Sequence, residues 1–156
     1  TVSMPPMNQN DAMDIFAFLQ KQKGSFETFQ IKIPLQNRGA EKSSTAVKVV
    51  GSHSAADSTI ALDGFAASTT GVLKAGDLIK FAGHTKVYMV QSDIDSDGSG
   101  AATVSIEPGI VSTLADNEVV TMNQPDFTVY LVSDVVYQAD RNSIFNISFD
   151  VREVIS

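Results

Sequence analysis

The chain has 156 residues, a length typical of one domain or of one domain that carries a small insertion. Its hydrophobic content of 43% with 19% charged residues is that of a folded globular protein and excludes bulk disorder. The absence of cysteine excludes disulfides and thiolate metal sites, and a net charge of −7 without a basic cluster speaks against binding to nucleic-acid phosphates.

No membrane segment is expected either. The longest apolar clusters, such as residues 15–19, are far too short to span a bilayer. Residues 1–6 show neither the charged region nor the apolar region of an export signal. We therefore expect a soluble protein that has no membrane partner.

The first predicted element is an amphipathic helix over about residues 11–22. Asn10 suits the N-cap and Gly24 suits the position after the C-cap. Phe18 lies outside the apolar stripe, so we expect it to face another part of the domain or a neighbouring subunit. The stripe itself has helical spacing and consists of Ala12, Ile15, Phe16 and Leu19.

After the helix, apolar and polar residues alternate, which is typical of strands. Pro34 ends the first of these strands because it has no N–H to donate. Turn sequences such as Asp63-Gly64 and Pro108-Gly109 separate the strand candidates. Many short strands with regular turns predict a sandwich or a barrel. The strand candidates are residues 29–33, 46–50, 59–62, 78–81, 86–90, 102–106, 118–122, 128–132, 135–138 and 144–154.

The strand over residues 144–154 has the clearest alternation. One predicted face is apolar and the opposite face is polar, which is typical of a strand with one buried side. We expect it to form a hairpin with the segment around Tyr137 through the polar turn 139–143. The apolar face consists of Phe145, Ile147, Phe149 and Val151.

The composition changes between about Gly51 and Asp116, where small and polar residues dominate. We therefore predict a mainly β (α+β) fold: a β-sandwich or barrel from both chain ends, with one N-terminal helix and an inserted small β module. The outer domain would comprise residues 1–50 and 117–156, and the barrel-like module residues 51–116. Residues 37–44 are expected to form a surface loop.

The sequence shows no catalytic motif. Its two histidines, His53 and His84, have no nucleophile at a recognisable spacing, and nucleophile elbows, metalloprotease helices and phosphate-binding loops are absent. A pair of catalytic carboxylates has no sequence spacing that would identify it. We therefore expect that the protein is not an enzyme.

An acidic segment allows two interpretations. Asp93, Asp95, Asp97 and Gly98 match the first half of an EF-hand loop, but its twelfth position is Val104 instead of glutamate. One alternative is a weak calcium site formed by the three aspartates, the sole cofactor that the sequence suggests. The other is a hairpin tip in which aspartate and glycine accommodate a turn.

The order of these segments resembles tail-tip or baseplate structural proteins of tailed bacteriophages and prophages. The resemblance covers nearly the whole chain. It is carried by Ile15-Phe-x-Phe-Leu, Gly24-Ser-Phe-Glu-Thr-Phe-Gln, Leu73-Lys-Ala-Gly-Asp-Leu-Ile-Lys-Phe, Lys86-Val-Tyr-Met-Val, Val119-Val-Thr-Met and Phe149-Asp-Val-Arg-Glu-Val-Ile.

The resemblance implies a structural virion protein of the tail. In such relatives a sheet with a short helix builds a ring, and an Ala-Gly-Asp turn resembles the start of an inserted barrel. The expected partners are further copies in a ring and other tail proteins, with assembly in the host bacterial cytoplasm. The alternative function is a host-surface ligand-binding β module stabilised by calcium, although the sequence has no Trp. Candidate assembly contacts are Phe18, Asn37, Arg38, Asp93, Asp95 and Asp97.

Overall fold

A computed structural model describes residues 1–40, 47–139 and 144–156. The chain divides into two compact units. One unit comprises Thr1–Ile31 and Thr128–Val154, and the other comprises Lys32–Phe127 with Ile155–Ser156. Strands account for 34% of the described residues and helix for 11%, so the prediction of a mainly β fold with one helix is confirmed.

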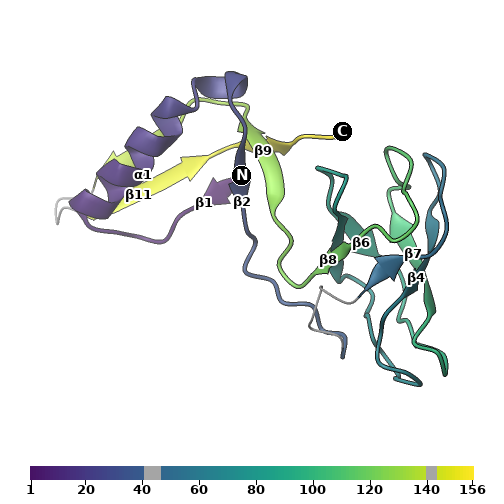
Figure 1. Cartoon of the computed structure of the whole chain (residues 1–156). Helices are drawn as coiled ribbons and strands as arrows, with labels where there is room; N and C mark the ends of the chain where they lie inside the picture. The colour runs from purple at the N-terminus through teal and green to yellow at the C-terminus, as the bar shows by residue number, and fades with distance from the viewer. Residues whose placement is uncertain (41–46, 140–143) are drawn as a thin grey trace. The chain divides into compact units, whose positions relative to one another are not determined.

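The helix α1 (Gln9–Lys21) lies in the first unit (Figure 1). Its N-cap is Asn8, whose Oδ1 accepts a hydrogen bond from the Asp11 amide at 3.0 Å. The predicted N-cap, Asn10, was wrong, because Asn8 has the extended backbone of a cap and Asn10 already lies in the first turn. The buried side of α1 includes Ala12 and Leu19, as the apolar stripe predicts.

Two three-stranded sheets complete the first unit. Their strand orders are β1-β11-β10 and β12-β9-β2, and α1 packs along β11 (Figure 1). The short 3-10 helix η1 (Gly24–Phe26) follows α1. The strands are β1 (Val2–Ser3), β2 (Phe29–Ile31), β9 (Phe127–Leu131), β10 (Val136–Ala139), β11 (Phe145–Phe149) and β12 (Val151–Glu153).

The predicted strand over 144–154 is interrupted at Asp150, where the chain passes from one sheet to the other. The Asp150 carbonyl accepts from the Val132 amide at 3.0 Å, while its carboxylate accepts from the Thr1 hydroxyl at 2.5 Å. The hairpin of β10 and β11 is confirmed, with Val136 opposite Ser148. Residues 140–143 of its predicted turn lie outside the described residues.

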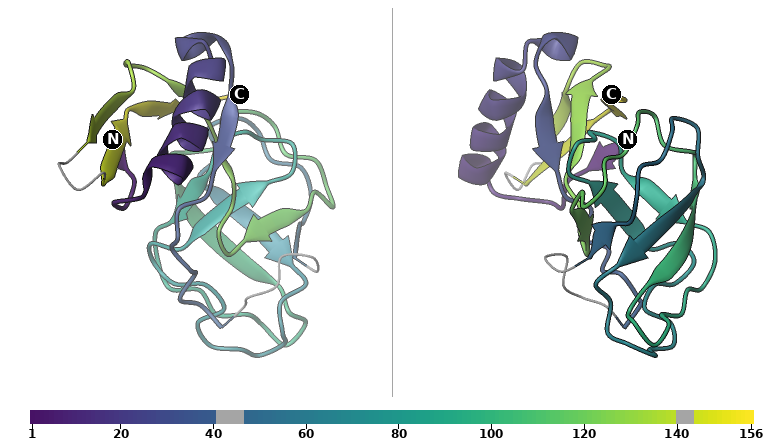
Figure 2. Two further views of the ribbon diagram at one scale, coloured as in Figure 1. Left: turned by 90° about the vertical axis from the view of Figure 1, so that its left-hand side faces the viewer. Right: turned by 45° about the vertical axis from the view of Figure 1, so that its right-hand side comes forward.

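The second unit contains a six-stranded antiparallel sheet that is nearly closed into a barrel (Figure 2). A bridge between Lys48 and Val119 joins its two ends, and the Val49 amide donates to the Glu118 carbonyl at 2.9 Å. The strand order is β3-β4-β7-β6-β5-β8. These strands are β3 (Lys48–Val49), β4 (Thr59–Asp63), β5 (Leu78–Phe81), β6 (Tyr88–Val90), β7 (Ala102–Glu107) and β8 (Val120–Met122).

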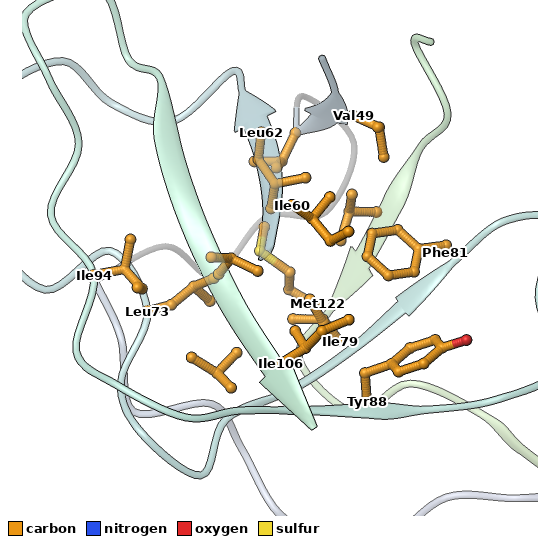
Figure 3. Close-up of a cluster of buried hydrophobic side chains, with 14 of the residues drawn as sticks. Val49, Ile60, Leu62, Leu73, Ile79, Phe81, Tyr88, Ile94, Ile106 and Met122 are labelled. Carbon is orange, nitrogen blue, oxygen red and sulfur yellow. The ribbon is translucent and has the colours of Figure 1, made fainter. Parts of the chain in front are cut away.

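Apolar side chains from all six strands fill the interior of this barrel (Figure 3). Burying each large side chain of this kind stabilises the fold by roughly 1.5–3 kcal/mol before entropy is subtracted. The alternation of buried and more exposed residues along β5 and β7 is that expected for a closed sheet. The core includes Val49, Ile60, Leu62, Leu73, Ile79, Phe81, Tyr88, Ile94, Ile106 and Met122.

The barrel extends beyond the predicted module of residues 51–116. Strands β3 and β8 belong to the same sheet and lie on either side of that range. Their side chains Val49 and Met122 are buried in the barrel core. The composition change therefore falls inside the second unit.

Candidate contact surfaces

Both histidines form hydrogen bonds inside the barrel unit. His84 is buried, with Nδ1 at 2.7 Å from the Tyr88 hydroxyl and Nε2 at 3.0 Å from the Ser112 hydroxyl. The Tyr88 hydroxyl also accepts from the Val111 amide at 3.1 Å, so this network ties strand β6 to a loop. His53 Nε2 accepts from the Ala61 amide at 3.4 Å. The hydroxyl beside His84 Nε2 is that of Ser112, and the other ring nitrogen is bound to the Tyr88 phenol and not to a carboxylate that would orient a catalytic histidine.

The three aspartates of the acidic segment bond to different parts of the barrel unit. Asp93 contacts the Lys74 ammonium at 2.9 Å and accepts from the Ala75 amide at 3.1 Å. The Lys74 hydrogen bond is the main reason why the pKa of Asp93 is lowered. Asp95 Oδ1 accepts from the Gly71 amide at 2.7 Å.

Asp97 builds the tip of its own loop. Its Oδ1 accepts from the Ser99 hydroxyl at 2.6 Å, the Ser99 amide at 2.8 Å and the Ala101 amide at 2.9 Å. The Ser99 hydroxyl is the main cause of the lowered pKa of Asp97. These bonds are those of a turn built by aspartate and glycine.

Asp93, Asp95 and Asp97 therefore have separate partners in this structure. In the described ranges, no group of three or more acidic or histidine side chains could hold a metal ion. The calcium site stays a prediction, and so does a contact role for the tip.

Asn37 and Arg38 lie in a segment that is bound to the Lys-Ala-Gly-Asp turn. The Asn37 amide donates to the Leu78 carbonyl and accepts from the Leu78 amide, both at 3.1 Å. Asn37 is 3% exposed, so in this structure its side chain is bound inside the barrel unit and does not reach the surface. Arg38 is exposed, and its guanidinium donates to the Ala75 carbonyl.

Asp77 holds this segment in place. Its buried carboxylate accepts from the backbone amides of Arg38 at 2.7 Å, Gly39 at 3.0 Å and Lys74 at 2.9 Å. A Cβ at Gly39 would overlap the carbonyl oxygen of Val72, so the segment can approach the barrel this closely only with glycine. We call residues 37–40 the strap; residues 41–44 of the predicted surface loop lie outside the described residues.

Phe18 is half-exposed on α1. Its ring meets the Phe29 ring edge to face, with 5.6 Å between their centroids. The helix therefore uses one side of this aromatic for packing on β2 and leaves the other side accessible. That accessible side keeps Phe18 available as a contact residue.

An apolar groove on the barrel unit was missed by the sequence analysis. It has a volume of about 480 Å³ and is lined by residues that include Ile33, Leu35, Met89 and Phe127. Leu35 is 59% exposed and Met89 47% exposed. The groove draws on separate segments of the chain, so no local sequence pattern identifies it.

Exposed large apolar side chains on a small barrel and on a helix-and-sheet unit are typical of proteins that act through contacts with other molecules. The family model described as distal tail protein pb9, B domain, matches residues 36–124, which is more than half of the chain. The chain therefore belongs to this family, and it is a structural protein of a phage tail. No curated protein matches the chain.

The match confirms the resemblance to phage tail-tip proteins. The matched range contains the strap and all six strands of the barrel. In the part of the chain that the structure describes, no helix has the length and apolar character needed to cross a membrane.

Proposed function

We propose that the protein is a non-enzymatic component of the tail tip or baseplate that assembles into a ring of copies and binds other tail proteins. The family match over the barrel carries this proposal. The same match does not favour a host-surface ligand-binding module. Assembly would take place in the host cytoplasm, and the protein would remain in the virion.

The physical properties of the surface support this role. Rings form when one copy presents a surface that fits a different surface on the next copy. Exposed large apolar side chains occur on both units, among them Phe18, Phe26, Leu35 and Met89. Because such side chains gain stability when they leave water, they favour association.

The contact roles of the remaining candidate residues are part of the proposal. Arg38 is exposed, and Asp93 and Asp97 keep negative charge to low pH because their pKa values are lowered. Exposed charges of this kind affect the rate and specificity of association more than its strength. Asp95 would contribute through its hydrogen bond to Gly71, which supports the loop.

The test is the oligomeric state of the full chain. Light scattering over a wide concentration range, together with negative-stain imaging, should show ring-shaped oligomers. A second arm mixes the protein with neighbouring tail proteins and looks for a joint particle. A strict monomer at all concentrations that also binds none of those proteins would contradict the proposed function.

A further inference from the structure

Two positions in the chain have the sequence that most readily forms isoaspartate, which is an aspartate followed by glycine. Of the thirteen aspartates, only Asp63 and Asp97 precede glycine, and no asparagine does. In this reaction the glycine amide nitrogen bonds to the side-chain carbon Cγ, the Cγ–OH bond breaks and water leaves, which gives a cyclic succinimide. Glycine favours the ring closure because it has no Cβ to obstruct the approach of its nitrogen. Water then opens the ring at either carbonyl, so the chain continues as aspartate or, through the side chain, as isoaspartate.

The folded structure restrains Asp97 on both its side chain and its main chain. Its Oδ1 accepts from the Ser99 hydroxyl at 2.6 Å, the Ser99 amide at 2.8 Å and the Ala101 amide at 2.9 Å. Its main-chain carbonyl accepts from the Ser68 amide at 2.7 Å and the Gly100 amide at 3.1 Å. Ring closure requires the following peptide to rotate relative to the side chain, so these bonds have to break first.

The ionisation of Asp97 opposes the reaction further. Only a neutral carboxyl group can release its oxygen as water after the amide nitrogen has attacked. The hydrogen bond from the Ser99 hydroxyl is the main reason why the pKa of Asp97 is lowered, so a smaller fraction of this carboxyl is neutral. Breaking hydrogen bonds to a charged group lowers the reactive population by roughly 10- to 100-fold. We therefore expect Asp97 to react slowly while the protein is folded.

Asp63 lies in a different environment. It is the exposed last residue of β4, and Gly64 leaves the strand with a left-handed φ of 92°. The cross-strand partner of Asp63 is Lys48, in the two-residue strand β3. Pairs at the end of a short ladder open at low free energy. The peptide after Asp63 can therefore rotate more easily than the peptide after Asp97.

We propose that the folded protein forms isoaspartate at Asp63 and not at Asp97, although both are followed by glycine. The reacting groups belong to the chain itself, and water is the leaving group and then the reactant that opens the ring. Isoaspartate at this position adds one carbon atom to the main chain between β4 and Phe65, whose ring is buried in the barrel core. The inference does not depend on the proposed ring.

A longer main chain at this point would also affect the acidic segment. The Phe65 amide donates to the Gly100 carbonyl at 3.0 Å, and the Ser96 hydroxyl donates to the Ala66 carbonyl at 2.5 Å. A Cβ at Gly100 would overlap the Phe65 carbonyl oxygen, so the two segments are in close backbone contact. Isomerisation at Asp63 would therefore displace the acidic segment as the protein ages.

Peptide mapping of the full-length protein tests the proposal, because trypsin places the two aspartates in different fragments, residues 49–74 and 87–141. The protein is incubated at neutral pH in heavy-oxygen water, so that opening of the succinimide adds a heavy oxygen atom. Electron-transfer fragmentation then distinguishes isoaspartate from aspartate. Isoaspartate should accumulate at Asp63 roughly 10- to 100-fold faster than at Asp97. In urea, where the bonds of the fold are lost, the two positions should react at similar rates.

Two variants at exposed positions separate the effect of the fold from that of the local sequence. Asp63→Glu keeps the charge but would have to close a larger ring, so its fragment should stay unmodified. The melting temperature of the wild type should fall during incubation, and that of Asp63→Glu should not. Ser99→Ala removes the hydroxyl from Asp97, so the reaction at Asp97 should become roughly 3- to 10-fold faster, the effect of one hydrogen bond.

The outcomes decide the proposal separately from the tail function. Equal rates at the two positions of the folded protein, or a faster reaction at Asp97, would overturn it. It would also be overturned if Asp63 formed isoaspartate in urea but not in the folded protein, because the fold would then protect both positions. None of these results would change the proposed function, which the oligomeric state tests.

Discussion

Asp77→Ala should destabilise the protein more than any surface change, because this carboxylate is the common acceptor of three backbone amides. Asp77 is 3% exposed and lies in the turn before β5. Its oxygens accept from Arg38 at 2.7 Å, Lys74 at 2.9 Å and Gly39 at 3.0 Å. Without the carboxylate, the strap loses its bonds from Arg38 and Gly39, and the turn loses its own bond from Lys74.

The expected loss follows from counting these donors. A hydrogen bond to a charged group contributes about 1.5–3 kcal/mol, and a buried donor without a partner costs about 1–3 kcal/mol. The bond from the Gly39 amide is buried, whereas the bonds from the Arg38 and Lys74 amides are part-buried, so those two donors can regain water more easily. Removing the carboxylate also removes the cost of burying it. We therefore expect a net loss of about 3–5 kcal/mol in the free energy of unfolding.

Urea unfolding followed by circular dichroism measures this loss, and hydrogen exchange locates it. The amides of Arg38, Gly39 and Lys74 should lose protection in Asp77→Ala. Asp77→Asn keeps one acceptor oxygen, so its free energy of unfolding should lie between those of the wild type and Asp77→Ala. Asp57→Ala is the matched control, because exposed Asp57 accepts from one amide, Ser54, at 2.9 Å. The reasoning would be refuted if the free energy of unfolding of Asp77→Ala lay within about 1 kcal/mol of the wild-type value, or if Asp77→Ala were as stable as the control.

Three further predictions concern the strap and the acidic segment. Gly39→Ala should lower the free energy of unfolding in urea by about 1–3 kcal/mol, because the added Cβ would overlap backbone atoms. The control Gly98→Ala should change it by less than about 0.5 kcal/mol, because the nearest atom to its Cβ lies at 3.9 Å. Equal effects of the two substitutions would contradict this prediction. Asp97 has a lowered pKa, so its contribution to stability is present above the ordinary value of 3.8 and lost as pH falls through the folded-state pKa. The urea stabilities of wild type and Asp97→Ala should therefore differ at neutral pH and converge in acid, and a constant difference would be inconsistent with that titration. Calorimetry with millimolar calcium should show no saturable heat, since the three carboxylates have separate partners; a saturable heat that Asp95→Ala abolishes would instead establish the calcium site.

The regular elements could be predicted because their signals are local. The stripe containing Ala12 and Leu19 identified α1, and the bounds of β5 agree with the predicted 78–81. Smaller features depend on partners far away in the chain. The strand break at Asp150 involves Thr1 and Val132, whose proximity no periodicity can indicate.

The contact surfaces were less predictable for the same reason. The Lys-Ala-Gly-Asp turn is recognisable as a motif in the sequence. The role of Asp77 as a hydrogen-bond acceptor, however, depends on amides about forty residues earlier in the chain. Asn37 looked like a loop residue because polar residues usually are, yet Leu78 satisfies its amide on both sides. The one local signal in the strap is the glycine at position 39, because a residue without a Cβ permits backbones to approach closely.

In the proposed assembly, folding and association would depend on different residues. Asn37 and Asp77 form their hydrogen bonds within the barrel unit. The three aspartates of the acidic segment also accept hydrogen bonds from backbone amides of this unit. Phe26 and Leu35 leave most of their apolar surface in water, so they contribute little to the stability of one copy. The same exposure makes them the side chains that gain most when another molecule covers them. Under the proposed function, the protein would fold before it meets its partners, and burial of these exposed side chains would then favour assembly.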